Sequence, residues 1–171
     1  MTQPSLPETP PPDRSVARTA ERLRDALRHA DPGTLAALRR TDPERLPAAF
    51  FRLTVDLLDE VLPAEAGPSR DRDEIRWAAV TRELAHAGDK LLAPVPLGEA
   101  LAKAGVAEMR VLRLLQASGA TLFDTAHSVV QQLVSRGQPF DPRQLAELVV
   151  REDSETVRRR IARDFYRHQD R

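Results

Sequence analysis

The chain has 171 residues, which is enough for one domain or two small helical lobes. Hydrophobic residues make up 41% and aromatic residues only 4%, so the interior must be built mainly from Leu, Ala and Val, which favours helices over sheet. Lys and Arg number 26, as do Asp and Glu, so any binding of nucleic acid must come from a local group of basic residues. We therefore predict an all-α fold of about eight or nine helices.

The composition also bears on compartment and chemistry. There is no cysteine, which excludes disulfides, zinc-thiolate sites and thiol nucleophiles. Residues 1–13 lack the basic start and apolar run of a signal peptide, and no stretch approaches the ~20 apolar residues of a membrane span. We expect a cytoplasmic protein with no membrane partner.

The first half of the chain begins with a proline-rich stretch and then turns helical. Residues 1–13 hold five prolines and few apolar residues, which predicts a disordered tail. From Arg14 the apolar residues Val16, Ala20, Leu23 and Leu27 recur on one helical face. Asp31-Pro32 predicts the start of a short helix that ends in the pair Arg39-Arg40.

Two longer helices are expected to complete this first lobe, residues 14–96. Asp42-Pro43 repeats the start signal, and a helix from Pro47 carries Arg52 on its polar side. Its predicted inward residues are Phe50, Phe51, Leu53, Leu57, Leu58, Val61 and Leu62. A second helix over 71–87 places Trp77 in the core, and the prolines after it predict an irregular connection.

The stretch 97–117 is the expected centre of the fold. A short helix ends at Gly105 and a second one follows directly. On that second helix the apolar residues Met109, Val111, Leu112, Leu114 and Leu115 cover most of the circumference, which predicts a central, buried helix. The remaining narrow strip holds Arg110, Arg113 and Ala117. Because the planar arginine fork suits phosphate, this strip indicates a phosphodiester partner.

Three further helices complete the second lobe, residues 97–171. One spans 121–136 and ends at Gly137, and the next begins at Asp141-Pro142 with Gln144 in a capping box. The last, from Ser154, turns Val157, Ile161 and Phe165 inward. Its other side carries a candidate basic surface of Arg159, Arg160, Arg163 and Arg167, although such a face is more often simply solvated.

Residues suited to catalysis do not cluster in the sequence. The four histidines, His29, His86, His127 and His168, fall on four different predicted helices without metal-binding spacing. Phosphate-loop, dinucleotide and nucleophile-elbow motifs are missing, and the acids are scattered among basic residues. We expect no enzyme activity, no metal, no cofactor and no small-molecule substrate.

One alternative for 97–117 is a DNA-binding helix-turn-helix. Gly105, Val111 and Leu114 fall where that motif places its turn glycine and two core residues. Leu101 stands where the motif requires a small side chain, and the second helix offers only a few polar residues to base edges. Because of these two mismatches, the helix-turn-helix is kept as the second hypothesis. It would make the protein a DNA-binding regulator or another helical adaptor.

Three segments in a fixed order carry a family resemblance over about residues 18–167. They are LAALRR with LPAAFFRL at 35–53, LGEALAKAGVAEMRVLRLLQA at 97–117, and LVSRGQPFDPRQLAELV leading to IARDFYR at 133–167. In these segments the chain resembles the CasB family, the small subunit of the type I-E CRISPR Cascade complex. The resemblance implies a two-lobed, non-enzymatic subunit, present as a pair, that braces guide RNA, target DNA and the displaced strand. The implied partners are other Cascade subunits, guide RNA, target DNA and a second copy of the chain.

The resemblance also implies a set of backbone-binding residues. By position they are Arg39, Arg40, Arg52, Arg110, Arg113 and Arg136. The chain departs from the family where a basic stretch is replaced by AHSVVQQL, so that His127, Ser128 and Gln131 stand for arginines. It departs again at two positions where the family has tryptophan: this chain has Pro142, after Asp141, and Ile161 near the C-terminus. These changes indicate a divergent member with a weaker basic surface on the second lobe.

Overall fold

The computed structural model describes residues 14–169, and within this range the chain forms nine α-helices and one 3-10 turn, with no strand. The first helices are α1 (Arg14–Arg28), α2 (Pro32–Arg39), α3 (Ala48–Leu58) and α4 (Pro68–Ala87), followed by the turn η1 (Asp89–Leu91). The others are α5 (Leu97–Lys103), α6 (Glu108–Gln116), α7 (Gly119–Ser135), α8 (Pro142–Val150) and α9 (Glu155–Gln169). The all-α prediction is confirmed, whereas the predicted tail 1–13 lies outside the described residues.

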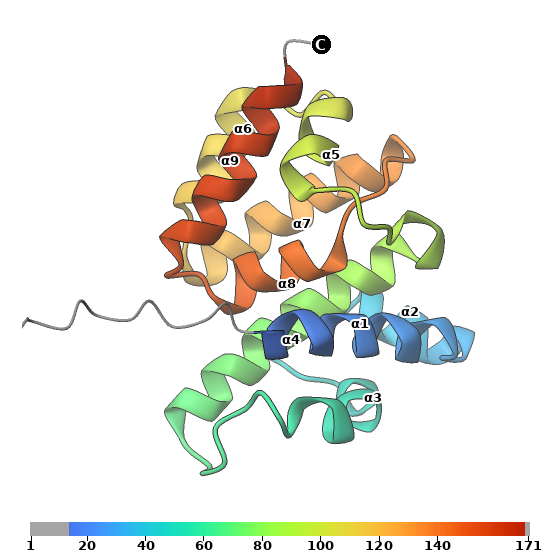
Figure 1. Ribbon diagram of the computed structural model, residues 1–171. Coiled ribbons are helices and arrows are strands. Elements are labelled where there is room, and N and C mark those ends of the chain that lie inside the picture. Colours follow the sequence, from blue (N-terminus) through green and yellow to red (C-terminus); the bar gives the residue numbers. More distant parts are fainter. Residues whose placement is uncertain (1–13, 170–171) are drawn as a thin grey trace, which may run out of the picture.

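The helices pack in two groups that share a long boundary. Figure 1 shows α1 to α4 in the lower part of the molecule and α5 to α9 in the upper part. At the boundary α1 packs on α8, and α4 packs on both α7 and α8. Buried apolar residues from both groups join in one cluster. The lobe boundary at residues 96 and 97 stays a prediction.

Local signals placed the starts of some helices correctly and misplaced others. Asp31 caps α2 as predicted, since its Oδ1 accepts a hydrogen bond from the Thr34 amide at 2.9 Å. The start signal at Asp42-Pro43 does not begin a helix, because Asp42 closes a turn by accepting a hydrogen bond from the Glu44 amide at 3.0 Å. The helix predicted from Pro47 is confirmed as α3, with Pro47 as its N-cap. Asp side chains stabilise turns as readily as helix starts.

The core of the first group follows the predicted apolar faces, with one clear exception. Val16, Leu23 and Trp77 are buried as expected. Phe51, predicted to point inward, is 45% exposed because its neighbour Phe50 takes the core position on α3. Adjacent helical residues are about 100° apart, so both could not enter one narrow interface.

Of the two helices in the 97–117 stretch, the first is the more deeply packed. Helix α5 packs closely along α9, and a Cβ added at its Gly98 would lie 2.1 Å from the Ile161 carbonyl oxygen. Helix α6 packs mainly against α7 and α9, and Met109 is 64% exposed. The prediction of a central, nearly enclosed α6 is therefore wrong. Ala117, expected on the exposed strip, is buried.

The ends of α7 and α8 show one confirmed stop signal and one corrected start signal. Gly137 follows α7 with φ 62°, the left-handed conformation that favours glycine at a helix end. Asp141 caps α8 through the Arg143 amide at 2.8 Å. Gln144 does not complete a capping box, because its Oε1 accepts the Leu97 amide at 2.9 Å. That bond ties the start of α5 to α8.

The final helix matches its predicted pattern, since Val157, Ile161 and Phe165 are all buried. Among residues 14–169, the structure contains no helix both long and apolar enough to cross a membrane.

Candidate nucleic-acid interface

A shallow groove lies where the start of α6 meets the outer side of α7. Its volume is about 530 Å³, and its lining consists of Gly105, Ala107, Arg110, Ser128, Gln131, Gln132, Ser135 and Arg136. The α7 residues recur at helical spacing, so hydroxyl and amide groups follow one another along a single face. The two arginines come from different elements and stand within the same polar lining.

Neither arginine of the groove has a carboxylate partner in the described part of the chain. Arg110 donates a hydrogen bond from Nη1 to the neutral Gln132 Oε1 at 2.8 Å. Arg136 is the C-cap of α7, is exposed, and makes no side-chain ion pair within residues 14–169. A cation at a helix C-terminus is favoured by the helix dipole. The groove therefore presents two positive charges with several neutral hydrogen-bonding groups, which suits phosphodiester oxygens.

Arg113 lies one turn beyond Arg110 on α6 but does not line the groove. Its side chain is exposed, and no hydrogen bond or ion pair from it is seen among the described residues. Arg113 thus extends the exposed positive charge along α6 past the groove.

The other three residues implied by the family resemblance belong to a separate part of the molecule. Arg39 and Arg40 end α2 and Arg52 lies on α3, and Figure 1 shows these two helices at the opposite end from α6. Arg39 donates from Nε to the Ala85 carbonyl at 2.9 Å, which caps the end of α4. Among the described residues, Arg52 donates a hydrogen bond only to the Ala48 carbonyl of its own helix, at 3.5 Å. The fold does not bring these residues together with Arg110.

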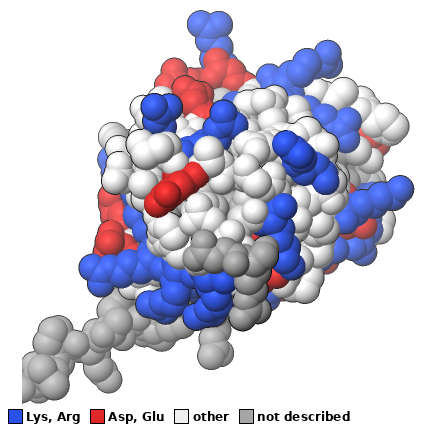
Figure 2. All heavy atoms as spheres, turned by 90° about the horizontal axis from the view of Figure 1, so that it is seen from above, with Lys and Arg blue, Asp and Glu red and all other residues white. Residues whose placement is uncertain are grey.

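The candidate basic surface on α9 is largely neutralised by acids. Arg159 pairs with Glu155 at 3.2 Å, Arg167 pairs with Asp164 at 3.7 Å, and Arg160 pairs with Glu147. Arg163 is exposed and has no such partner within the described residues. Figure 2, which views the molecule from above, shows basic side chains in several separate groups, with acidic ones beside some of them.

His127 does not share the groove with its neighbours Ser128 and Gln131. Its Nδ1 lies 3.0 Å from both oxygens of Glu83, which is almost fully buried, and its ring lies 5.0 Å from that of His86. Burial lowers the pKa of His86, because the charged imidazolium is costly to remove from water. No group of three or more side chains suited to a metal ion occurs within residues 14–169.

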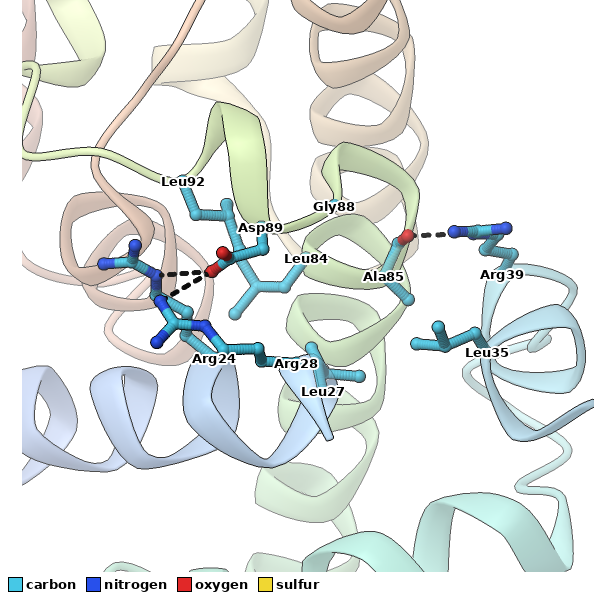
Figure 3. A pocket seen from close by; sticks show the side chains of 10 residues that line it. All are labelled: Arg24, Leu27, Arg28, Leu35, Arg39, Leu84, Ala85, Gly88, Asp89 and Leu92. Atoms are coloured by element: carbon cyan, nitrogen blue, oxygen red, sulfur yellow. Dashed lines mark hydrogen bonds and ion pairs between the residues drawn. The ribbon is translucent and has the colours of Figure 1, made fainter. Parts of the chain in front are cut away.

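A second group of basic side chains was not predicted from the sequence. Figure 3 shows Arg24 and Arg28 of α1 directed at Asp89, which follows α4. Asp89 lies far along the chain from both arginines, so only the tertiary fold reveals the group. The four-residue spacing of the two arginines was the only available signal, and it is equally common on solvated helices.

Comparison with known proteins gives a clear family assignment. The family described as CRISPR-associated protein Cse2 matches residues 34–166, which is most of the chain. The chain belongs to this family. The match confirms the resemblance to the Cascade small subunit and covers both the α6–α7 groove and the arginines of α2 and α3.

Two solved structures share the fold of this Cse2-family chain. One is a chain in the crystal structure of E. coli Cascade bound to a PAM-containing double-stranded DNA target, with TM-score 0.63 and 24% identity over 86% of this chain and 94% of that chain. The other is CasB from Thermobifida fusca, with TM-score 0.60 and 18% identity over 91% of this chain and 96% of that chain. A comparison with curated protein sequences gives no significant match.

Proposed function

We propose that this Cse2-family chain is a non-catalytic small subunit of a type I-E Cascade-like complex and holds nucleic-acid backbone in the α6–α7 groove. The observation that carries the proposal is the pair Arg110 and Arg136, which share a polar groove without a carboxylate in its lining. Family membership supports the setting, and a chain of the same fold occurs in E. coli Cascade bound to a DNA target. The proposed partners are other Cascade subunits, guide RNA, target DNA and a second copy of the chain.

The groove favours the backbone over the bases. Both charged groups are arginines, and the remaining polar lining consists of hydroxyls and amides along one helix face. Contacts of this kind position a strand without reading its sequence. In such a complex, sequence recognition comes from pairing with the guide RNA. Arg113 extends the contact along α6, and Arg40 and Arg52 form a second, separate contact, whereas Arg39 is engaged with the Ala85 carbonyl at the end of α4.

The helix-turn-helix alternative receives no support from the packing. In that motif the first helix packs against the recognition helix. Here the main packing partner of α5 is α9, and Leu101 of α5 is fully buried. The protein alone should therefore show no sequence-specific binding to duplex DNA.

The test is the affinity of assembled complexes for target DNA over a series of salt concentrations. Complexes are purified after co-expression with wild-type subunit or with Arg110→Glu/Arg136→Glu. The double variant should weaken binding to all guide-matched targets to the same extent. Each lost phosphate contact removes ~0.7–0.9 from the slope of log affinity against log salt concentration, so the slope should fall by roughly 1.5.

A control with the same charge change is Arg18→Glu/Arg72→Glu, since both residues are exposed and lie on α1 and α4, outside the groove. The control complex should retain the wild-type slope. An equal loss in both double variants would assign the effect to net charge and reject the groove. A new sequence preference of the free double variant would favour the regulator hypothesis.

A further inference from the structure

A small pocket with an apolar floor opens between α1, α2 and the end of α4. Its volume is about 220 Å³. The floor is formed by the leucines Leu27, Leu35, Leu84 and Leu92, drawn in Figure 3. Pockets for cofactors and drug-sized ligands usually measure about 300–1,000 Å³. This one is large enough for a single apolar side chain and too small for a nucleotide cofactor.

The mouth of the pocket carries more positive than negative charge. Arg24 Nε and Arg28 Nη2 both donate to the same oxygen of Asp89, at 3.4 and 2.9 Å. Arg39 uses Nε on the Ala85 carbonyl, and its two terminal nitrogens have no partner among the described residues. Hydrogen bonding from Arg28 lowers the pKa of Asp89, so this carboxylate stays ionised. The lining therefore holds three guanidinium groups and one carboxylate, with Arg24 and Arg28 directed at Asp89 and Arg39 at the Ala85 side of the pocket.

We infer that this pocket docks a short acidic segment of another protein chain, with one apolar side chain held between the leucines and an adjacent carboxylate held by the arginines. Charge complementarity argues for the acid, because the arginines of the lining outnumber Asp89 and its neighbour Asp25, both of which act on Arg28. The leucine floor argues for a peptide over a nucleic-acid backbone, which offers no aliphatic side chain to fill it. The α6–α7 groove, by contrast, is lined mostly by polar groups. The inference does not depend on the function proposed for that groove.

Asp89 makes it possible to distinguish a binding site from a purely structural group of residues. Its carboxylate already occupies Arg24 and Arg28, so an incoming carboxylate must share these donors with it. An exposed like charge at that distance opposes binding only weakly, because solvent screens it. Replacing Asp89 with Asn should therefore strengthen the binding of an acidic segment, whereas a residue needed only for folding would not strengthen any binding.

The experiment is an NMR titration of the full chain, following the methyl groups of Leu35 and Leu92. The probes are the blocked pentapeptide Ser-Asp-Leu-Asp-Ser, its Asn analogue Ser-Asn-Leu-Asn-Ser, its Ala analogue Ser-Asp-Ala-Asp-Ser, and a thymidine hexanucleotide. The acidic leucine peptide should shift both methyls, and both analogues should bind at least roughly fivefold more weakly.

Three variants complete the design. Asp89→Asn should bind the acidic peptide about threefold more tightly, and Arg28→Gln should bind it several-fold more weakly. Glu155→Gln removes a paired, exposed carboxylate on α9 and should leave the affinity unchanged. Thermal melts establish that each variant is folded, and Arg28→Gln provides the test should Asp89→Asn fail to fold.

The inference is overturned by any of four results. The first is that the acidic peptide shifts neither methyl in the wild-type chain. The second is that folded Asp89→Asn binds the peptide no more tightly, and the third is that Arg28→Gln binds it equally well. The fourth is that the hexanucleotide displaces the peptide from the same methyls, which would make the pocket a phosphate site.

Discussion

Helices α5 and α6 are neighbours in the chain, yet α5 is deeply buried and α6 leaves one side exposed to solvent. Helix α5 approaches α9 so closely that a glycine is needed at the contact, and Leu97, Ala100 and Leu101 are fully buried. Helix α6 covers its inner side with Val111 and Leu114 and leaves its outer side to solvent. The difference shows that the helix with the weaker apolar pattern stabilises this part of the fold. The more apolar one provides the exposed arginines.

The largest expected effect comes from Gly98→Ala on α5. The new Cβ would lie 2.1 Å from the Ile161 carbonyl oxygen and 2.7 Å from the Phe165 amide nitrogen. Because both are backbone atoms, α5 and α9 must separate, and the free energy of unfolding should fall by about 2–3 kcal/mol. Denaturant unfolding measures this loss.

The matched control is Gly33→Ala in the exposed first turn of α2. There the added Cβ would meet only Asp31 Oδ1, at 3.1 Å, and alanine has the higher helix propensity. Its unfolding free energy should stay within about 1 kcal/mol of wild type. Equal midpoints for the wild type and Gly98→Ala would show that α5 and α9 are not in close contact.

On α6, replacing a leucine with alanine should lower the unfolding free energy more on the inner side than on the outer side. Leu114 is fully buried, and Leu114→Ala should cost about 2–5 kcal/mol in unfolding free energy. Leu112 was expected in the core but is only partly buried, so Leu112→Ala should cost clearly less. The same denaturant measurement compares them, and a greater loss for Leu112 would reverse the assigned orientation of α6.

The sequence predicted which residues share a helix face better than how much of each helix is covered. The inward residues Val157, Ile161 and Phe165 of α9 follow directly from helical periodicity. The exposure of Met109 does not, because it depends on which helices happen to pack beside α6. Gln144 was misassigned for a similar reason, since its partner Leu97 lies on another helix.

The candidate site shows the same division between local and long-range information. The family resemblance selected Arg110 and Arg136, but only the fold places them in one groove. Two neutralising pairs on α9, Glu155–Arg159 and Asp164–Arg167, could have been read from their helical spacing. The pair of Arg160 with Glu147 joins two helices and was not predictable from spacing.

A smaller effect is expected for Met109→Lys on the outer side of α6. Met109 is 64% exposed and contributes little buried apolar area. The substitution should change the unfolding free energy by no more than about 0.5 kcal/mol, as is usual for exposed positions. A loss comparable to that of Leu114→Ala would mean that this side of α6 is covered after all.

Arg113→Glu is expected to change folding little and binding clearly, so it separates the two on α6. Arg113 is exposed and has no hydrogen bond or ion pair in the described part of the chain, but it lies in the last turn of α6, where the helix dipole favours a cation, so its replacement should lower the unfolding free energy by no more than about 1 kcal/mol. Assembled complexes carrying the variant should nevertheless hold target DNA less tightly, by the same factor for every guide-matched sequence. The slope of log affinity against log salt concentration should fall by about 0.7–0.9, the share of one phosphate contact. Arg72→Glu on α4 carries the same charge change and should alter neither quantity. If Arg113→Glu also leaves the salt slope unchanged while Arg110→Glu/Arg136→Glu lowers it, the bound backbone is confined to the groove and does not continue along α6.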